Sequence, residues 1–269
     1  MMPEHSVVLI TGAGGGLGTA MTRGLLAAGR CVVGLDIAAA SESLANLERD
    51  AARLDAADRF YSVVADVRSE ADCIRAVAAA RERFGTLHAL VNNAALGMSA
   101  HSLDAQDGKL RFYEISADFW SALFDTNVNG SFNMARSVAP HLVAQGFGRI
   151  VNVVTGLMTM TRGGFTPYGP AKAALEAASA AWAEELAGTG VTVNALLPGG
   201  AADTAMVPHA SVSDRSTLVA PDTMVAPNVW LTSAAADGVT GLRIIGKDWD
   251  PGLAADANLA RCARAGWKR

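Results

Sequence analysis

Tyr168 and Lys172 stand four positions apart in an otherwise apolar second half of the chain. Residues four apart on a helix share one face, so this spacing places a phenol beside an ammonium. A nearby cation favours the phenolate, which brings the pKa of a tyrosine, ordinarily about 10, closer to neutrality. Thr155 lies thirteen residues before the tyrosine, and its hydroxyl can hydrogen-bond a substrate oxygen. The three residues predict acid/base chemistry.

A glycine-rich turn at residues 11–18 (Thr-Gly-Ala-Gly-Gly-Gly-Leu-Gly) suggests what that chemistry serves. Glycines let the backbone approach a pyrophosphate, and the N-terminus of the helix that follows favours an anion. A tight turn without a ligand looks the same, but the strand before it and the helix after it indicate a dinucleotide site. The residues expected to bind the cofactor here are Gly12, Gly14, Gly16, Leu17 and Gly18.

Asp36 is the acidic residue that ends the next predicted strand. Its carboxylate can accept both ribose hydroxyls of an adenosine and would repel a 2′-phosphate. A solvated aspartate at a strand end is the plainer interpretation. No arginine or lysine stands at positions 13–15 or at Ile37, which is also expected to line the site. The sequence therefore favours NAD over NADP.

Alternating elements must position these residues. Short apolar runs predict strands, and periodic segments between them predict helices. The predicted strands are 7–10, 31–35, 60–65, 87–91, 149–154, 191–197 and 242–245, and the main helices are 17–28, 41–54, 69–84, 116–145 and 167–187. Such alternation indicates an α/β fold with a doubly wound, mostly parallel sheet in three αβα layers, in which ligands bind outside the carboxyl ends of the strands. We expect one domain over 1–269, with a substrate loop at 199–220 and a tail at 246–269.

Composition excludes several other classes. The 269 residues carry a formal net charge of -4, and no basic run exceeds Lys268-Arg269, so nucleic-acid or membrane-surface binding is not indicated. Cys31, Cys73 and Cys262 are too widely spaced for a metal site or disulfide framework, which fits a cytoplasmic protein. The hydrophobic fraction of 51% and an alanine-rich helix at 171–187, apolar nearly all round, predict a homo-oligomer.

Several short motifs follow one another along the chain: Thr11-Gly12-x-x-x-Gly16-x-Gly18, Asp66-Val67, Asn92-Asn93-Ala94-Ala95, Asn127-Val128-x-Gly130, Tyr168-x-x-x-Lys172, and Asn194-Ala195-x-x-Pro198-Gly199 followed by Thr204. With them the chain resembles the short-chain dehydrogenase/reductase family of the single-domain, Rossmann-fold type. The resemblance covers nearly the whole chain, and this ordered set is far more specific than any one motif.

The resemblance implies a role for each matching position. Tyr168 is the general acid/base, Lys172 lowers its pKa and binds the nicotinamide ribose, and Asn127 anchors a water that relays protons through the lysine. Further cofactor contacts are implied for Asp66 and Val67 at the adenine, for Asn92 and Ala94 after the fourth strand, and for Pro198, Gly199 and Thr204 beside the carboxamide. Family members commonly form dimers or tetramers, so a homotetramer is expected.

The chain departs from the family pattern at Thr155, where serine is usual. Threonine keeps the hydroxyl but adds a methyl group and a stiffer χ1, which predicts a functional site with an altered pocket. Reduced activity is the alternative, because a misplaced donor weakens transition-state stabilisation. The segment Asn92-Asn93-Ala94-Ala95 has an alanine where glycine is usual, and residues 245–250 replace a common Asp-Gly-Gly ending.

These features predict an NAD-dependent oxidoreductase that moves a hydride between nicotinamide and a secondary alcohol or ketone. A 3-oxoacyl-thioester reductase, acting on acyl carrier protein or CoA substrates, and a dinucleotide-binding sensor with weak catalysis stay open. Either a pocket or ordinary core packing explains the apolar residues Leu157, Met158, Met160, Phe165, Met206 and Val207. Lys109 and Arg111 are candidates for meeting an anionic substrate, or belong to a solvated loop.

Overall fold

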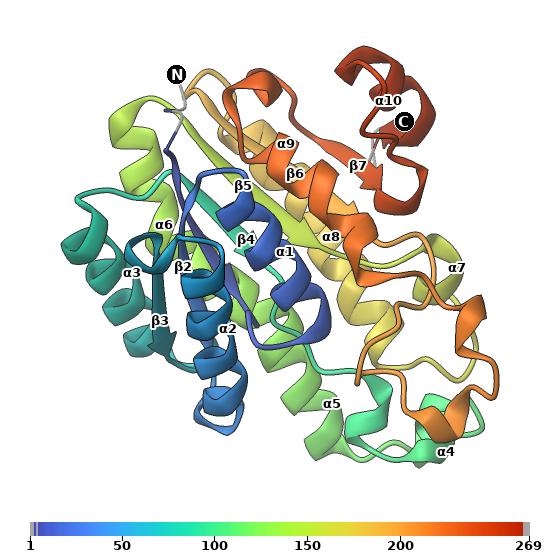
Figure 1. The fold of residues 1–269 in the computed structure, drawn as a ribbon. Coiled ribbons are helices and arrows are strands. Elements are labelled where there is room, and N and C mark those ends of the chain that lie inside the picture. Colours follow the sequence, from blue (N-terminus) through green and yellow to red (C-terminus); the bar gives the residue numbers. More distant parts are fainter. Residues whose placement is uncertain (1–2, 4, 266–269) are drawn as a thin grey trace.

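The computed structural model describes residue 3 and residues 5–265, and one twisted sheet organises them (Figure 1). The strand order is β3-β2-β1-β4-β5-β6-β7-β8, parallel except for β8, which pairs antiparallel with β7. The strands are β1 (Val7–Thr11), β2 (Cys31–Asp36), β3 (Phe60–Val64), β4 (Ala89–Asn92), β5 (Gly148–Val153), β6 (Val191–Leu197), β7 (Leu242–Ile245) and β8 (Ala263–Ala265). The predicted doubly wound, mostly parallel sheet is confirmed.

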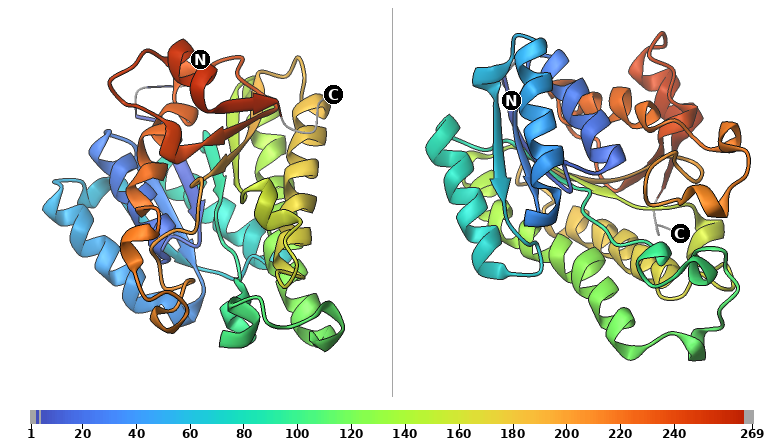
Figure 2. Two further views of the ribbon diagram at one scale, coloured as in Figure 1. Left: turned by 90° about the vertical axis from the view of Figure 1, so that its right-hand side faces the viewer. Right: turned by 60° about the horizontal axis from the view of Figure 1, so that its bottom comes forward.

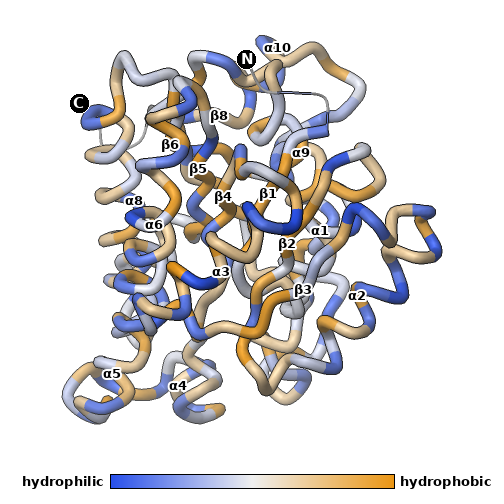
Figure 3. Tube along the Cα trace, turned by 90° about the vertical axis from the view of Figure 1, so that its left-hand side faces the viewer, coloured by the Kyte–Doolittle hydropathy of each residue, from blue (hydrophilic) through white to orange (hydrophobic). Residues whose placement is uncertain are grey.

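Helices cover both faces of the sheet. One layer holds α1 (Gly16–Ala27), α2 (Ser41–Arg53) and α9 (Val225–Leu231), and the other holds α3 (Glu70–Phe84), α6 (Gly130–Gln145) and α8 (Tyr168–Glu185). The left view of Figure 2 separates the blue and orange helices from the green and yellow ones. Successive strand residues face opposite layers, so Val8 and Ile10 join one core while Leu9 joins the other. The hydrophobic strands in the middle of Figure 3 follow from this two-sided burial.

Local signals in the sequence account for several helix ends. The Ser69 hydroxyl accepts the backbone N–H of Asp72 at 3.2 Å, and Gly85 ends the same helix in the left-handed region with φ +79°. Ser116 likewise caps α5 (Ala117–Phe124). Ser41, where the helix 41–54 was expected to begin, is the first residue of α2, and its hydroxyl donates to the carbonyl of Ala38.

Two differences from the predicted elements affect the site and the edge of the sheet. The helix expected from 116 to 145 is interrupted by a π-helical segment at Asp125–Asn129 between α5 and α6. The tail, which had no predicted element, contains α10 (Ala255–Cys262) and β8, so it covers the edge of β7 with backbone hydrogen bonds. No helix in the described part of the chain is long and apolar enough to cross a membrane.

Candidate active site

The carboxyl ends of the parallel strands gather the sequence-predicted residues at one edge of the sheet. The strand order reverses between β1 and β4, which is where open α/β sheets bind ligands. The residues that end these strands or follow them within two positions are Thr11, Asp36, Asn92, Thr155 and Pro198. The predicted crevice therefore has the topology it needs.

Tyr168, Lys172 and Thr155 meet at this edge. Tyr168 is the first residue of α8 and Lys172 lies one turn further on, as the spacing predicts. The side chain of Thr155 lies beside the phenol of Tyr168, close enough to lower the pKa of that phenol. The buried ammonium of Lys172 donates to the backbone carbonyl of Val153 at 2.8 Å. The methyl group of Thr155 therefore leaves its hydroxyl within reach of the tyrosine.

The acidity of this cluster differs from the prediction. Burial raises the pKa of Tyr168 to about 12, although the neighbouring Thr155 side chain opposes that rise. Burial also lowers the pKa of Lys172 to about 8, since a desolvated ammonium is disfavoured. The lowered tyrosine pKa that was expected is thus not found, because the effect of desolvation is the largest. With a pKa of about 12, Tyr168 is a neutral phenol at neutral pH.

The glycine-rich turn leaves the N-terminus of α1 open. Its N-cap, Gly15, makes no side-chain cap, and the first turn contains no acidic residue. The turn is too tight for side chains: a Cβ on Gly18 would lie 2.0 Å from the Gly12 carbonyl oxygen, and one on Gly12, at φ +63°, would lie 2.8 Å from Cα of Ala94. Uncapped backbone N–H groups beside a side-chain-free surface suit the pyrophosphate of a dinucleotide.

Asp36 lies against this turn. One carboxylate oxygen accepts the backbone N–H of Gly14 at 2.8 Å, and the other accepts the N–H of Ile37 at 2.8 Å. Ile37 itself is exposed, with 46% of its surface accessible. The carboxylate is thus fixed beside the glycines, where an adenosine ribose would meet it, and an apolar side chain stands next to it.

Asn92 was expected to support the cofactor site, but its neighbour Asn93 holds the glycine turn. The amide of Asn92 donates into the core, to Ser131 at 3.1 Å and Asn152 at 2.9 Å, and its Oδ1 has no partner among the described residues. Asn93, which the sequence analysis missed, donates to the carbonyls of Thr11 and Gly12 at 3.0 Å each. Asn93 therefore holds the glycine turn directly, and its place in the Asn-Asn pair was the available signal.

Asn127 lies in the π-helical segment, a feature often found at functional sites. Its Oδ1 accepts the backbone N–H of Leu96 at 2.7 Å, and its Nδ2 donates to the Leu96 carbonyl at 3.0 Å. The side chain thus fixes the loop after β4. A water relay through Lys172 stays a prediction.

Asp66 and Val67, the residues expected at the adenine, differ in burial: Asp66 is half-buried and Val67 is buried. Asp66 forms an ion pair with Arg68 at 2.6 Å, which holds the pKa of the carboxyl below its usual range. Val67 is buried against Gly130, where an added Cβ would come within 2.5 Å of Cγ2 of the valine. Gly130 is therefore needed for this packing, while Asp66 stays half-buried.

The predicted substrate loop folds over the turn and the active-site edge. Thr204 packs on Gly16, and Met206 packs on Gly97, since a Cβ on either glycine would lie 2.5 Å from that side chain. Arg215 secures the loop by donating to the carbonyl of Val207 at 2.8 Å and by pairing with Asp203. The short helices α4 (Leu103–Gln106) and α7 (Leu157–Met160) lie beside the orange loop at the lower right of Figure 1.

The remaining cofactor candidates lie at the end of β6. Gly199 adopts φ +93°, and the stem of Lys247 fills the space that a side chain would need. The backbone N–H of Lys247 donates to the Pro198 carbonyl at 3.1 Å. The segment after β7 therefore supports the turn that was expected beside the carboxamide.

The candidate pocket residues separate into two groups. Met160 is buried in the core, whereas Leu157 and Met158 are exposed, at 55% and 86%. Lys109 pairs with Asp104 and Asp107 in the exposed loop, which favours the solvated-loop interpretation of this lysine.

Comparisons with known proteins agree with this geometry. The family model described as short chain dehydrogenase matches residues 6–214. The 2-(R)-hydroxypropyl-CoM dehydrogenase of Xanthobacter autotrophicus is 34% identical over 193 residues, covering 72% of this chain and 73% of the relative. Among solved structures, a 3-ketoacyl-(acyl-carrier-protein) reductase from Brucella melitensis complexed with NADH has a TM-score of 0.75 and 28% identity, covering 88% of this chain and 94% of that one.

A gluconate 5-dehydrogenase from Burkholderia cenocepacia, solved with NADP and tartrate, has a TM-score of 0.77 and 28% identity, covering 91% of this chain and 95% of that one. The matched residues include the glycine turn, Tyr168 and Lys172. The chain is a member of the short-chain dehydrogenase/reductase family, with its Rossmann fold.

Proposed function

We propose that the protein is an NAD-dependent oxidoreductase that interconverts a secondary alcohol and a ketone, with Tyr168 as the general acid/base. The observation that carries the proposal is the placement of the Thr155 side chain beside the phenol of Tyr168, close enough to lower its pKa, with Lys172 one helical turn away. Such a hydroxyl pair can bind one substrate oxygen from two sides. General acid/base catalysis of this kind contributes about 10²–10⁴ in rate.

Each side chain has a defined proton task. In reduction, the phenol of Tyr168 donates its proton to the ketone oxygen while Thr155 orients that oxygen. In oxidation, the phenolate takes the hydroxyl proton of the alcohol. Lys172 stabilises the phenolate and would bind the nicotinamide ribose. A bound dinucleotide would supply or accept the hydride.

The preference for NAD rests on Asp36. Its carboxylate stands at the glycine turn, where a 2′-phosphate would meet a like charge. The open N-terminus of α1 accommodates the pyrophosphate with either dinucleotide. Related structures were solved with NADH and with NADP, so this carboxylate is the feature that argues for NAD in this chain.

A 3-oxoacyl-thioester reductase is the second candidate. The similarity to the Brucella melitensis reductase favours it. A sensor with weak catalysis is less well supported, because the Thr155 side chain still lies beside the phenol of Tyr168 and lowers its pKa. Both enzymatic candidates use the same proton chemistry and differ in the substrate bound beneath the loop at 199–220.

A substrate panel with both cofactors tests the proposal. NADH and NADPH oxidation should be followed with simple ketones, hydroxy ketones and 3-oxoacyl thioesters, beside direct measurement of NADH binding. We expect turnover with NADH on at least one ketone. NADH binding without turnover on any class would contradict the proposal and favour a sensor, and turnover confined to thioesters would favour the second candidate.

We further propose a cytoplasmic homo-oligomer, with a tetramer as the working model. Exposed Phe132 on α6 lies with its ring centroid 6.5 Å from that of Trp182 on α8, which gives these two helices an accessible aromatic surface. The cytoplasmic assignment rests on three free, separated cysteines. Light scattering coupled to size-exclusion chromatography gives the mass in solution, and a monomer at working concentration would contradict the oligomer.

A further inference from the structure

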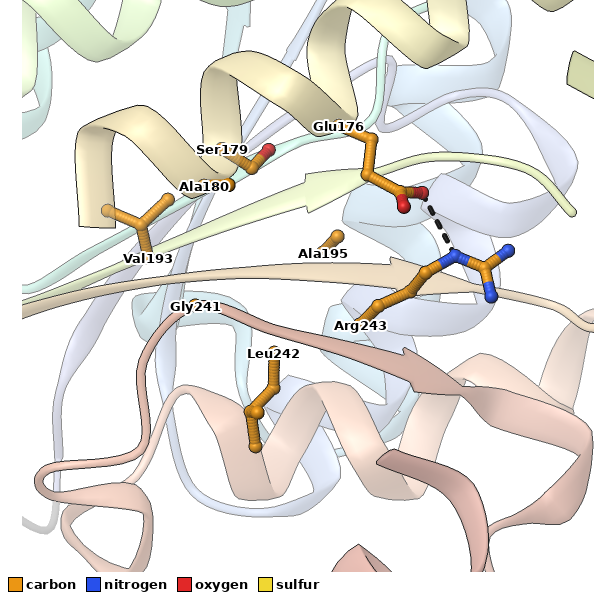
Figure 4. Close-up of a pocket in the computed structure, with 8 residues that line it drawn as sticks. All are labelled: Glu176, Ser179, Ala180, Val193, Ala195, Gly241, Leu242 and Arg243. Atoms are coloured by element: carbon orange, nitrogen blue, oxygen red, sulfur yellow. Dashed lines mark hydrogen bonds and ion pairs between the residues drawn. The ribbon is translucent and has the colours of Figure 1, made fainter. Parts of the chain in front are cut away.

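A buried ion pair links α8 to β7 behind the active site. The Nε of Arg243 donates to Oε2 of Glu176 at 2.9 Å, and the two side chains are 8% and 4% exposed (Figure 4). Figure 4 shows both charged groups between the helix and the strands, at one end of a small cavity that Ser179 and Ala195 also line. Because burying charges is costly even when they are paired, such a pair needs an explanation beyond stability.

The second contact of the guanidinium reaches the active site. Nη2 of Arg243 donates to the backbone carbonyl of Thr155 at 3.0 Å. The backbone ladder of β5 continues through the bond from the Val154 N–H to the Leu196 carbonyl, and the chain then turns toward α7. Arg243 therefore holds the backbone of Thr155 just where the regular strand pairing ends.

Helix α8 thus holds Thr155 from two sides. Tyr168, Lys172 and Glu176 follow each other at four-residue intervals and share one helix face. Tyr168 lies beside the side chain of Thr155, while Glu176 acts on its carbonyl through Arg243. This closed set of contacts fixes the distance between the two hydroxyls that would bind the substrate oxygen.

We propose that Arg243 is a positioning residue that fixes Thr155 relative to Tyr168, with Glu176 orienting the guanidinium. The inference rests on the proposed function, because it assigns Thr155 the task of orienting the substrate oxygen. The displacement of a reacting group by about 1 Å can cost about a hundredfold in rate, so loss of this support should lower kcat without weakening cofactor binding.

The test must separate positioning from the penalty of a stranded charge. Burial raises the pKa of Glu176, and Arg243 opposes that rise, so removal of Arg243 alone leaves an unpaired buried carboxyl. The informative variant is therefore the double substitution Glu176→Gln with Arg243→Met, which removes both charges. Arg243→Lys tests whether a point charge without the planar fork suffices.

Arg149 offers a matched control. It is 1% exposed, begins near the opposite end of β5, donates to the carbonyls of Gly148 and Ser233, and pairs with Asp237. Arg149→Met should lower thermal stability, yet leave kcat of the folded enzyme within about twofold of wild type, since Arg149 is remote from Thr155.

The deciding experiment is a double-mutant cycle with Thr155→Val on the best ketone substrate. In the wild-type background, we expect Glu176→Gln with Arg243→Met to lower kcat about ten- to a hundredfold while the affinity for NADH stays unchanged. In the Thr155→Val background, the same double substitution should change kcat by less than about twofold. Additive losses in both backgrounds, or wild-type kcat in the double variant, would overturn the positioning role. Tyr168→Phe in the same assay separates the positioning role of Arg243 from the proposed function. If Tyr168→Phe keeps wild-type turnover, the proposed function fails. If Tyr168→Phe is inactive while the double variant keeps wild-type kcat, only the role of Arg243 fails.

Discussion

The ammonium of Lys172 donates to the backbone carbonyl of Val153 at 2.8 Å, two residues before Thr155. The lysine is therefore held between the end of β5, just before Thr155, and the helix that carries the phenol. Burial raises the pKa of Tyr168 and lowers that of Lys172, so at neutral pH the phenol is neutral and the lysine, with a pKa of about 8, is mostly charged.

The two directions of the reaction should depend differently on pH. The pKa of Tyr168, about 12, makes the neutral phenol dominant at neutral pH. Reduction needs the phenol and the Lys172 ammonium, so its kcat/KM should stay level from about pH 6 to about pH 7 and fall as the lysine loses its proton near its pKa of about 8. Oxidation needs the phenolate and should rise from about pH 6 to about pH 8. Initial rates in both directions check this. A level oxidation profile would show that Tyr168 is already ionised in the complex.

Removal of the lysine should affect chemistry more than folding. Lys172→Met keeps an apolar stem of similar length but deletes the cation beside the phenol. We expect kcat to fall about 10²–10⁴-fold, because the phenolate loses its electrostatic support. Steady-state kinetics with a parallel thermal melt measure both effects. Wild-type kcat in a folded Lys172→Met variant would contradict the role.

Asp36 should determine cofactor preference. Asp36→Asn retains an oxygen that can accept the Gly14 N–H but removes the charge. Since like charges brought together cost several kcal/mol, affinity for NADPH should improve by about tenfold or more relative to NADH. Fluorescence titration with both cofactors gives the ratio. An unchanged ratio would remove Asp36 as the selectivity residue.

The packing of Gly130 on Val67 can be tested by stability. In Gly130→Ala the new methyl group would lie 2.5 Å from Cγ2 of Val67, which should lower the free energy of unfolding by about 1–3 kcal/mol. Gly163→Ala is the control, because no heavy atom lies within 4 Å of its added Cβ. Urea unfolding of both variants measures the difference, and equal stabilities would contradict this packing.

His88 should couple stability to acid pH. Its Nδ1 accepts the Val7 N–H at 2.8 Å, and burial lowers its pKa. The unfolded state, with a histidine pKa near about 6.5, therefore binds the proton more readily, and stability should decline as pH falls below that value. His88→Leu should cost about 1–3 kcal/mol at neutral pH and show a shallower decline. Parallel slopes for wild type and variant would exclude His88 as the source.

Much of the sheet and the placement of the proposed acid/base pair follow from local patterns. The four-residue spacing of Tyr168 and Lys172 predicts their shared helix face, and Asp36 is placed at the glycine turn by the alternation of strands and helices. The family resemblance itself is confirmed by the family match. These features depend on periodicity and on residues close in sequence.

Other features depend on contacts between distant segments. The choice of Asn93 over Asn92 to hold the turn is decided by the pleat of β4, and the raised pKa of Tyr168 by burial that no local pattern reports. The buried ion pair of Arg243 has a signal in the sequence, since an arginine inside the apolar run 242–245 implies a buried acidic partner. Glu176, on the helix face that Tyr168 and Lys172 share, is the acidic residue that could fill that role.

Turnover by Tyr168→Phe tests the central claim most directly, because this substitution removes only the phenolic oxygen. With the best substrate from the ketone panel, we expect kcat to fall by about 10²–10⁴-fold while the affinity for NADH stays within about twofold of wild type. A variant that binds NADH and keeps wild-type kcat would show that Tyr168 is not the general acid/base.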